Sequence, residues 1–188
     1  GHDLGIGYPH LALEAAGDIA QFDLAIYLGS GAVHQHHLDA LGGEQRDIAD
    51  QVRAAGARIK FITDGDAPAA VSAGIPSAGV DMMLGIGGSP EGVVAACAPK
   101  CLEGDFQGRL WPRNDDDRRL AEERGIDLTK VLRIEDLVKG DDVFFAATGV
   151  TGGDLLQGVE YTAGGAVSES LVMRSRSGTI RRIRTEHH

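Results

Sequence analysis

The chain has 188 residues, and its 18 Lys and Arg against 28 Asp and Glu give a formal net charge of −10, which excludes a nucleic-acid binder that relies on bulk positive charge. Hydrophobic residues make up 43% of the chain and charged residues 24%, which excludes extensive disorder. No apolar run approaches the ~18 residues of a membrane span and no signal peptide is recognisable, so we expect a cytoplasmic protein without membrane contacts.

The first half of the chain predicts helices that alternate with strands, because apolar residues recur at helical spacing in some segments and form short β-branched runs in others. Gly56 is a natural stop for the helix before it. The predicted elements are a weak helix over 11–16, a strand over 22–28, a helix over 44–55, a strand over 57–62, a helix over 67–73 and a strand over 80–84.

The clearest helix start in the sequence is Ser89-Pro90-Glu91. Ser89 can cap the helix, Pro90 suits its first position, and Glu91 is favourable in its first turn. We expect Pro99 to end or kink this helix, because proline lacks the N–H that the helix needs. Further predicted elements are helices over 115–124 and 134–139, a strand over 143–147, and a hairpin of strands 167–173 and 179–184 around Ser177-Gly178.

This alternation predicts an α/β fold with layers of helices on a mixed, mostly parallel sheet. Glycine makes up 27 of the 188 residues, about twice the usual share of ~7%. The glycines gather after apolar runs, at residues 64–66, 85–88 and 148–154. In parallel sheets ligands bind beyond the carboxyl ends of the strands, so we expect these three loops to converge.

The three loops carry groups that suit a cation and a phosphate together. Asp64, Asp66, Glu91 and Asp154 offer hard carboxylate oxygens for a divalent cation. The backbone N–H groups of residues 85–88 and the start of the following helix suit an anion. The same residues also have plainer interpretations, because Asp-Gly is ordinary turn chemistry and an acidic residue in the first turn of a helix stabilises that helix.

A nucleotide-binding domain is an alternative that the glycine loop disfavours. The third glycine of a G-x-G-x-x-G motif is replaced by Pro90, and no Walker A motif occurs. A serine nucleophile in a G-x-S-x-G elbow is also absent from the sequence.

Three further groups of residues have both a structural and a functional interpretation. His34, His36 and His37 fit a polar loop or helix surface better than a metal site. Cys97 and Cys101 fit reduced core thiols. The last part of the chain holds five arginines that suit phosphate contacts or a soluble edge hairpin, and that lack the aromatic residues of a nucleic-acid site: Arg174, Arg176, Arg181, Arg182 and Arg184.

Five blocks of the sequence, in this order, resemble the C-terminal half of class II fructose-1,6-bisphosphatases, including those that also accept sedoheptulose-1,7-bisphosphate. The resemblance extends from residue 46 to residue 184, about three quarters of the chain. The blocks are ITDGD at 62–66, DMMLGIGGSPEGVVAA at 81–96, KCLEGDFQGRLWPR at 100–113, DDVFFAATGVTGGDLLQGV at 141–159 and SLVMRSRSGTIRRI at 170–183.

The resemblance implies a layered α/β sandwich of the sugar-phosphatase type, of which residues 46–188 would be the C-terminal α/β domain and residues 1–45 an unmatched segment. It implies hydrolysis of the 1-phosphate of a ketose bisphosphate with Mg²⁺ or Mn²⁺, in a homo-oligomer. By the same resemblance, Asp64, Gly65 and Asp66 bind the sugar phosphate, as does the backbone of Gly88, and Glu91 binds the metal. Arg174 and Arg176 are additional candidates for phosphate contacts, and the catalytic residues stay unassigned.

The chain departs from the family in two respects. The family takes most of its metal-binding carboxylates from an N-terminal half that has no counterpart here. Where the family has a basic, proline-centred motif on the substrate phosphate, this chain has Gly42-Gly43-Glu44-Gln45. The second hypothesis is therefore a catalytically incomplete domain that binds sugar phosphates.

Overall fold

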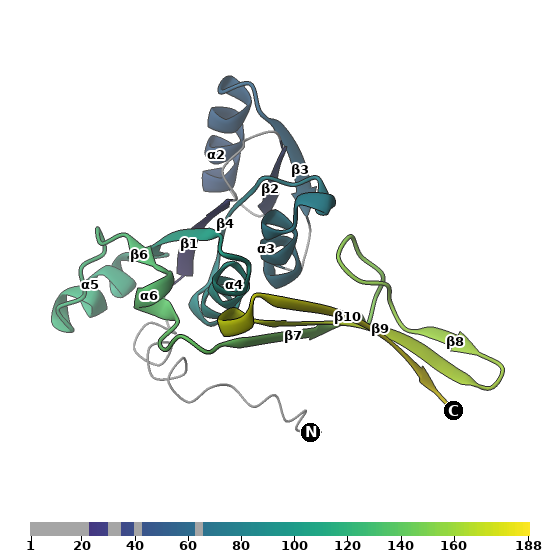
Figure 1. Cartoon of the computed structure of the whole chain (residues 1–188). Coiled ribbons are helices and arrows are strands. Elements are labelled where there is room, and N and C mark those ends of the chain that lie inside the picture. Colours follow the sequence, from purple (N-terminus) through teal and green to yellow (C-terminus); the bar gives the residue numbers. More distant parts are fainter. Residues whose placement is uncertain (1–22, 30–34, 40–42, 63–65) are drawn as a thin grey trace.

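The computed structural model describes residues 23–29, 35–39, 43–62 and 66–188, which form two β-sheets and the helices packed on them (Figure 1). The described strands of the larger sheet lie in the order β3-β2-β4-β1-β5-β6. Their bounds are Asp23–Gly29 for β1, Gln35–Asp39 for β2, Arg58–Ile62 for β3, Met82–Gly88 for β4, Asp105–Trp111 for β5 and Leu132–Arg133 for β6.

The smaller sheet is antiparallel throughout its described strands, in the order β10-β9-β7, with β8 paired to the far end of β9. It confirms the predicted hairpin, in which Gly178 takes the left-handed conformation at φ 58°. The strands are Phe144–Thr148 for β7, Glu160–Thr162 for β8, Gly165–Arg174 for β9 and Thr179–His187 for β10.

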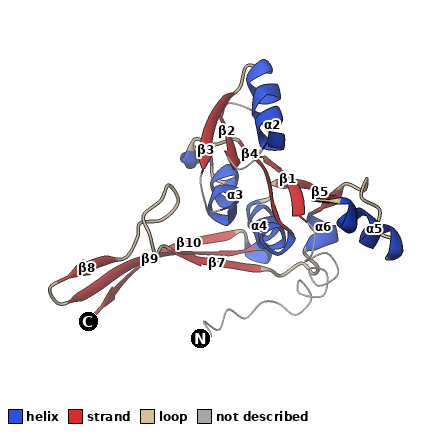
Figure 2. Ribbon diagram, turned by 180° about the vertical axis from the view of Figure 1, so that it is seen from behind, coloured by secondary structure: helices blue, strands red, loops and turns tan. Residues whose placement is uncertain are grey.

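The helices cover both faces of the larger sheet. Successive residues of a strand point to opposite faces, so Leu84, which lies against α2, and Met83, which lies in the core with α3 and α4, mark the two faces of β4. α4 also contacts β7 and β9, and therefore lies between the two sheets (Figure 2). The helices are α2 (Gly43–Ala54), α3 (Asp66–Gly74), α4 (Ser89–Leu102), α5 (Asp115–Glu123) and α6 (Ile134–Leu137).

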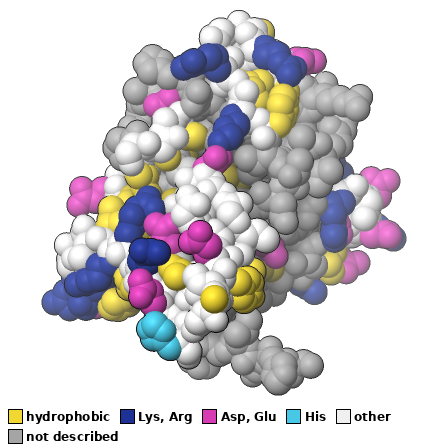
Figure 3. All heavy atoms as spheres, turned by 90° about the vertical axis from the view of Figure 1, so that its right-hand side faces the viewer, with side chains coloured by type: hydrophobic (Ala, Val, Ile, Leu, Met, Phe, Trp, Pro, Cys, Tyr) yellow, Lys and Arg dark blue, Asp and Glu magenta, His cyan; other side chains and the backbone are white. Residues whose placement is uncertain are grey.

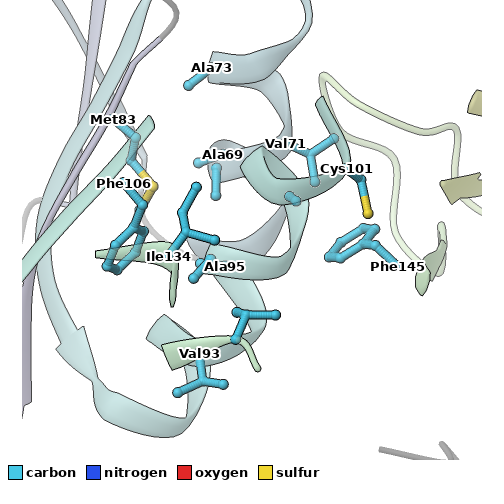
Figure 4. Close-up of a cluster of buried hydrophobic side chains, with 14 of the residues drawn as sticks. Ala69, Val71, Ala73, Met83, Val93, Ala95, Cys101, Phe106, Ile134 and Phe145 are labelled. Atoms are coloured by element: carbon cyan, nitrogen blue, oxygen red, sulfur yellow. The ribbon is translucent and has the colours of Figure 1, made fainter. Parts of the chain in front are cut away.

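Small residues let α3 and α4 lie close together in the main core (Figure 4). A Cβ atom at Gly74 of α3 would come within 2.5 Å of Leu102 Cδ1 of α4, so the two helices end side by side. Large side chains from the sheets, among them Phe106 and Leu171, fill the space around the helices at 0% exposure. The buried alanines of the two helices are Ala69, Ala70, Ala73, Ala95, Ala96 and Ala98.

The prediction of a mostly parallel sheet is wrong. β2 pairs in parallel with β3 and with β4, but β1 lies between β4 and β5 and is antiparallel to both. β4 and β5 consequently run in the same direction, as the helix between them predicts, yet they do not pair with each other. The alternation of strands and helices predicts that β4 and β5 run in the same direction. It does not predict that β1, from an earlier part of the chain, lies between them.

The glycine run at 85–88 is also not the loop that the sequence predicts. These residues are the last part of β4, which pairs with β1 through Gly88. Each of these four residues pairs with a residue of β1, and this pairing holds them in a strand in spite of the low strand propensity of glycine. Gly88, and not Ser89, is consequently the N-cap of α4, and Ser89, which is fully buried, is the first residue of the helix.

Pro99 does not end α4, which continues to Leu102. Pro99 and Cys101 are both buried, so packing against the core offsets the loss of one backbone hydrogen bond. The helix ends at Glu103, which lies in the left-handed region at φ 55° and donates its N–H to the carbonyl of Pro99.

The structure confirms the remaining predicted elements that fall within the described residues. These are β1, α2, β3, α3, α5, α6 and β7, while the predicted helix over 11–16 lies outside the described residues. Four of the described strands are not among the predicted elements: β2, β5, β6 and β8. No helix in the described part of the chain combines the length and the apolar character that crossing a membrane requires.

Candidate functional site

At the start of α4, a strand that ends in glycine is followed directly by a helix N-terminus. β4 ends at Gly88, whose φ of −62° and ψ of 139° are extended, and the 14-residue helix begins at the next residue. The first N–H groups of an α-helix have no partner within the helix, and together with the helix dipole they attract anions. The end of β4 therefore has the backbone chemistry of a phosphate site.

Glu91 folds back over this strand end. A Cβ atom at Gly88 would collide with Glu91 Oε2 and would lie 3.2 Å from Glu91 Cδ, so the carboxylate lies directly against the Gly88 backbone. The Glu91 side chain is exposed at the surface. The structure thus brings together two of the residues that the sequence predicts for the site, the backbone of Gly88 and the carboxylate of Glu91.

The junction of β3 and α3 lies at the same edge of the larger sheet. β3, β2 and β4 are parallel, and Phe61 and Leu84 both pair with Leu38, so Ile62 lies level with Gly85. One intervening strand separates β3 from β4, a distance of about 10 Å. α3 begins at Asp66 and packs beside α4, so both helices start from this edge (Figure 1). Of the predicted substrate residues here, Asp64 and Gly65 lie outside the described residues, as does the side chain of Asp66.

The third predicted loop belongs to the smaller sheet. β7 does not lie in the larger sheet, so the prediction that all three loops follow strands of one sheet is wrong. The loop nevertheless reaches the larger sheet, because Asp154 forms an ion pair with Lys60 of β3. No sequence signal pointed to this contact, since the two residues are 94 positions apart.

Arg174 lies at the other end of α4 and is fully engaged there. Its Nε and Nη2 donate to Asp142 Oδ1 and Oδ2 at 2.7 and 2.5 Å, and its guanidinium lies 4.9 Å from the centre of the Phe144 ring. The hydrogen bond from Arg174 holds the pKa of Asp142 below its usual value. The ion pair is therefore a structural contact between the end of β9 and the residues just before β7.

The position of these arginines relative to α4 follows from hydrogen bonds near Val143. The carbonyl of Val143 accepts from Cys101 Sγ at 3.6 Å and from the Ser175 N–H at 2.9 Å, so Ser175 lies beside the last turn of α4. Ten residues of helix, about 15 Å, separate Cys101 from Glu91. The structure does not bring Arg174 or its exposed neighbour Arg176 to the Gly88–Glu91 end.

Among the described residues, Glu91 is the one carboxylate that the family resemblance predicts as a metal ligand. Nowhere in the described part of the chain do three His, Cys, Asp or Glu side chains cluster so that they could hold a metal ion. Glu91 has the hard oxygen that Mg²⁺ and Mn²⁺ prefer, but such ions take about six ligands. The carboxylate fits the ion, and it can be only one of several ligands.

The two cysteines do not add chemistry to this end of α4. Burial raises the pKa of Cys97 to about 11 and also raises that of Cys101, so neither thiol is activated. His36 and His37 lie on β2, so the prediction that they occupy a loop or helix surface is wrong; His34 lies outside the described residues.

Comparison with known proteins identifies close relatives. The sequence matches the family described as "Bacterial fructose-1,6-bisphosphatase, glpX-encoded" over residues 44–187. A Synechococcus protein named D-fructose 1,6-bisphosphatase class 2/sedoheptulose 1,7-bisphosphatase is 46% identical over 154 residues, covering 75% of this chain and 44% of that protein. Fructose-1,6-bisphosphatase 1 class 2 of Escherichia coli is 40% identical, covering 75% of this chain and 46% of that protein. The chain thus spans about half the length of these curated relatives.

Proposed function

The chain belongs to the family of bacterial, glpX-encoded fructose-1,6-bisphosphatases, and on that premise we propose that it forms the substrate-binding part of a metal-dependent sugar-bisphosphate phosphatase. The proposed reaction is hydrolysis of the 1-phosphate of fructose-1,6-bisphosphate, with sedoheptulose-1,7-bisphosphate as a second substrate. Both substrates are named in the Synechococcus relative. We assign this part to residues 46–188.

The observation that carries the proposal is the contact between the Glu91 carboxylate and the Gly88 backbone at the start of α4. The helix N-terminus offers N–H donors to phosphate oxygens, and Glu91 offers an oxygen to a cation at the same point. α3 starts at the same edge and provides a second helix N-terminus, with Asp66 as its first residue and Asp64 and Gly65 before it in the sequence. We propose that these three residues bind the phosphorylated sugar.

In this arrangement the protein binds and orients the substrate. The backbone at Gly88 has no side chain, so a sugar phosphate can approach it closely. Glu91 holds one side of a bound Mg²⁺ or Mn²⁺, which when present neutralises phosphoryl charge and polarises the phosphorus centre. A cation also lets an acidic protein accept a highly anionic substrate, because it offsets the repulsion between them. Arg174 and Arg176 are not included, because they lie beside the opposite end of α4.

A specific observation favours a second candidate, a sugar-phosphate-binding chain without turnover. Among the described residues Glu91 is the one carboxylate of the expected metal set, and a single ligand does not build a metal site. Binding and hydrolysis therefore have to be measured separately.

The test is a calorimetric titration with fructose-1,6-bisphosphate, with and without Mn²⁺, together with an assay of phosphate release. Metal-dependent binding and release support the phosphatase, and binding without release supports the second candidate. If neither binding nor phosphate release is observed, both candidate functions are contradicted. Glu91→Gln should abolish the effect of Mn²⁺ while the circular dichroism spectrum stays unchanged, and Glu123→Gln on the exposed surface of α5 should behave like the wild type.

We also propose that the protein is a cytoplasmic homo-oligomer with no nucleic-acid partner. The net charge of −10 supports the last point, since it opposes binding to a polyanion. Light scattering coupled to size-exclusion chromatography measures the oligomeric state, and a mass of 19.7 kDa would show a monomer.

A further inference from the structure

The ion pair between Lys60 and Asp154 links the two sheets at a point close to the proposed substrate edge. Lys60 lies on β3, two residues before the end of the strand, and Asp154 lies in the loop that follows β7. Both side chains are about half-exposed. Figure 3 shows a face of the molecule on which basic and acidic side chains lie side by side in this way.

The strand that carries Lys60 is an edge strand. Among the described strands β3 pairs only with β2 and forms the edge of the larger sheet. It is five residues long, and it leads directly toward the start of α3. A short edge strand opens more readily than a central one, because half of its backbone groups have no partner in the sheet.

The loop that carries Asp154 is closed by its own backbone. The Val159 N–H donates to the carbonyl of Val150 at 3.1 Å, and the Gly153 N–H donates to that of Leu156 at 3.0 Å. A Cβ atom at Gly149 would collide with the carbonyl of Gln157, so the two sides of the loop lie in close contact.

The same loop is fixed to the smaller sheet. Leu155 and Leu156 are each 7% exposed and lie in the main core. The Gln157 N–H donates to Glu169 Oε2 of β9 at 2.7 Å, and Arg182 Nη1 of β10 donates to the carbonyl of Leu155 at 3.0 Å. These contacts hold the loop in place, so that Asp154 can restrain the edge strand through Lys60.

We propose that the Lys60–Asp154 ion pair is a positioning contact, which fixes the end of β3 and the start of α3 relative to Gly88 and Glu91. This inference rests on the proposed function, in which both helix starts bind one phosphorylated sugar. Neither member of the pair touches the substrate in this account. Lys60 lies level with Met83 in the sheet, five residues before Gly88, or about 17 Å along the strand direction.

The test compares Lys60→Met, Asp154→Asn and the exchange of both charges, Lys60→Asp with Asp154→Lys. Two quantities are measured: affinity for fructose-1,6-bisphosphate by calorimetry, and hydrogen exchange of backbone amides over residues 58–70. Arg119→Met is the matched control, because it removes an exposed cation of α5 whose partner, Asp116, lies three residues away on the same helix. Melting temperature is recorded for all variants and should change little, since exposed ion pairs contribute little to global stability.

We expect each single substitution to raise amide exchange over residues 58–70 and to lower affinity by about three- to fivefold, as the loss of one surface ion pair allows. Exchanging both charges should restore both quantities, which loss of packing alone would not do, and Arg119→Met should change neither. Unchanged exchange in Lys60→Met and Asp154→Asn, or no restoration by the exchanged pair, overturns the inference. Failure of the wild-type chain to bind the sugar phosphate contradicts the proposed function instead, and hydrogen exchange still decides whether the ion pair fixes β3.

Discussion

At the scale of single residues, the proposal rests on Gly88, the N-cap of α4, and Glu91, in its first turn. The family resemblance predicted Glu91 as a metal ligand and the backbone of Gly88 as a substrate contact. The structure adds that the carboxylate lies on the Gly88 backbone, so that a side chain at Gly88 would displace this carboxylate. That contact depends on the turn between strand and helix, so residue types alone do not predict it.

Gly88→Ala tests the contact directly. The new methyl group would displace the Glu91 carboxylate, which is the end of a flexible side chain, so we expect little loss of stability but about a tenfold loss of affinity for fructose-1,6-bisphosphate in Mn²⁺. Gly164→Ala is the control, since no atom lies within 4 Å of its added Cβ. Equal affinities for the two variants in calorimetry would remove Gly88 from the site.

Asp142 gives a prediction for the dependence of stability on pH. Its hydrogen bond from Arg174 lowers the pKa of the carboxyl in the folded state below the ordinary 3.8. The pair therefore contributes its full stabilisation above pH 3.8, and this contribution is lost as the pH falls through the lower, folded-state value.

Asp142→Asn should therefore lower the urea midpoint at pH 6 and lose less stability than the wild type between pH 5 and pH 2.5. Asp141→Asn is a matched neighbour and should follow the wild-type profile. Parallel profiles for wild type and Asp142→Asn would show that the ion pair does not contribute to folding stability.

At the scale of elements, the sequence predicted α2, α3 and α5 well because their apolar spacing or capping residues are local signals. It failed where neighbours elsewhere in the chain decide the outcome. The glycines of β4 form a strand because they pair with β1. α4 continues past Pro99 because packing against the core compensates for the lost hydrogen bond. Contacts of this kind are distant in sequence, so a local pattern does not contain them.

The end of α4 offers a stabilising substitution. Glu103 holds the left-handed conformation at φ 55°, which costs a residue with a side chain roughly 1 kcal/mol, and its side chain is exposed. Glu103→Gly should raise the free energy of unfolding by about 0.5–1 kcal/mol in urea titrations. Glu122→Gly, within α5, should lower it by about 1 kcal/mol. A loss of stability in Glu103→Gly would show that the Glu103 side chain itself contributes to the fold.

At the scale of the whole molecule, α4 extends from the proposed site to the smaller sheet. Its first turn lies at the edge of the larger sheet from which α3 also starts, and its last turn lies beside the Ser175 end of the smaller sheet. The family resemblance predicted the site residues, but the strand order, the inserted β1 and the Lys60–Asp154 link came only with the structure. All three join segments that are far apart in sequence, so no pattern along the chain could have predicted them.

The most direct test of the central claim is a titration of the ¹⁵N-labelled chain with fructose-1,6-bisphosphate in Mg²⁺, followed by amide chemical shifts. We expect the largest chemical-shift changes at Gly88, Ser89 and Glu91 and at the first residues of α3. Shifts centred on Arg174 and Arg176, at the opposite end of α4, or an unchanged spectrum at saturating sugar phosphate, would contradict it.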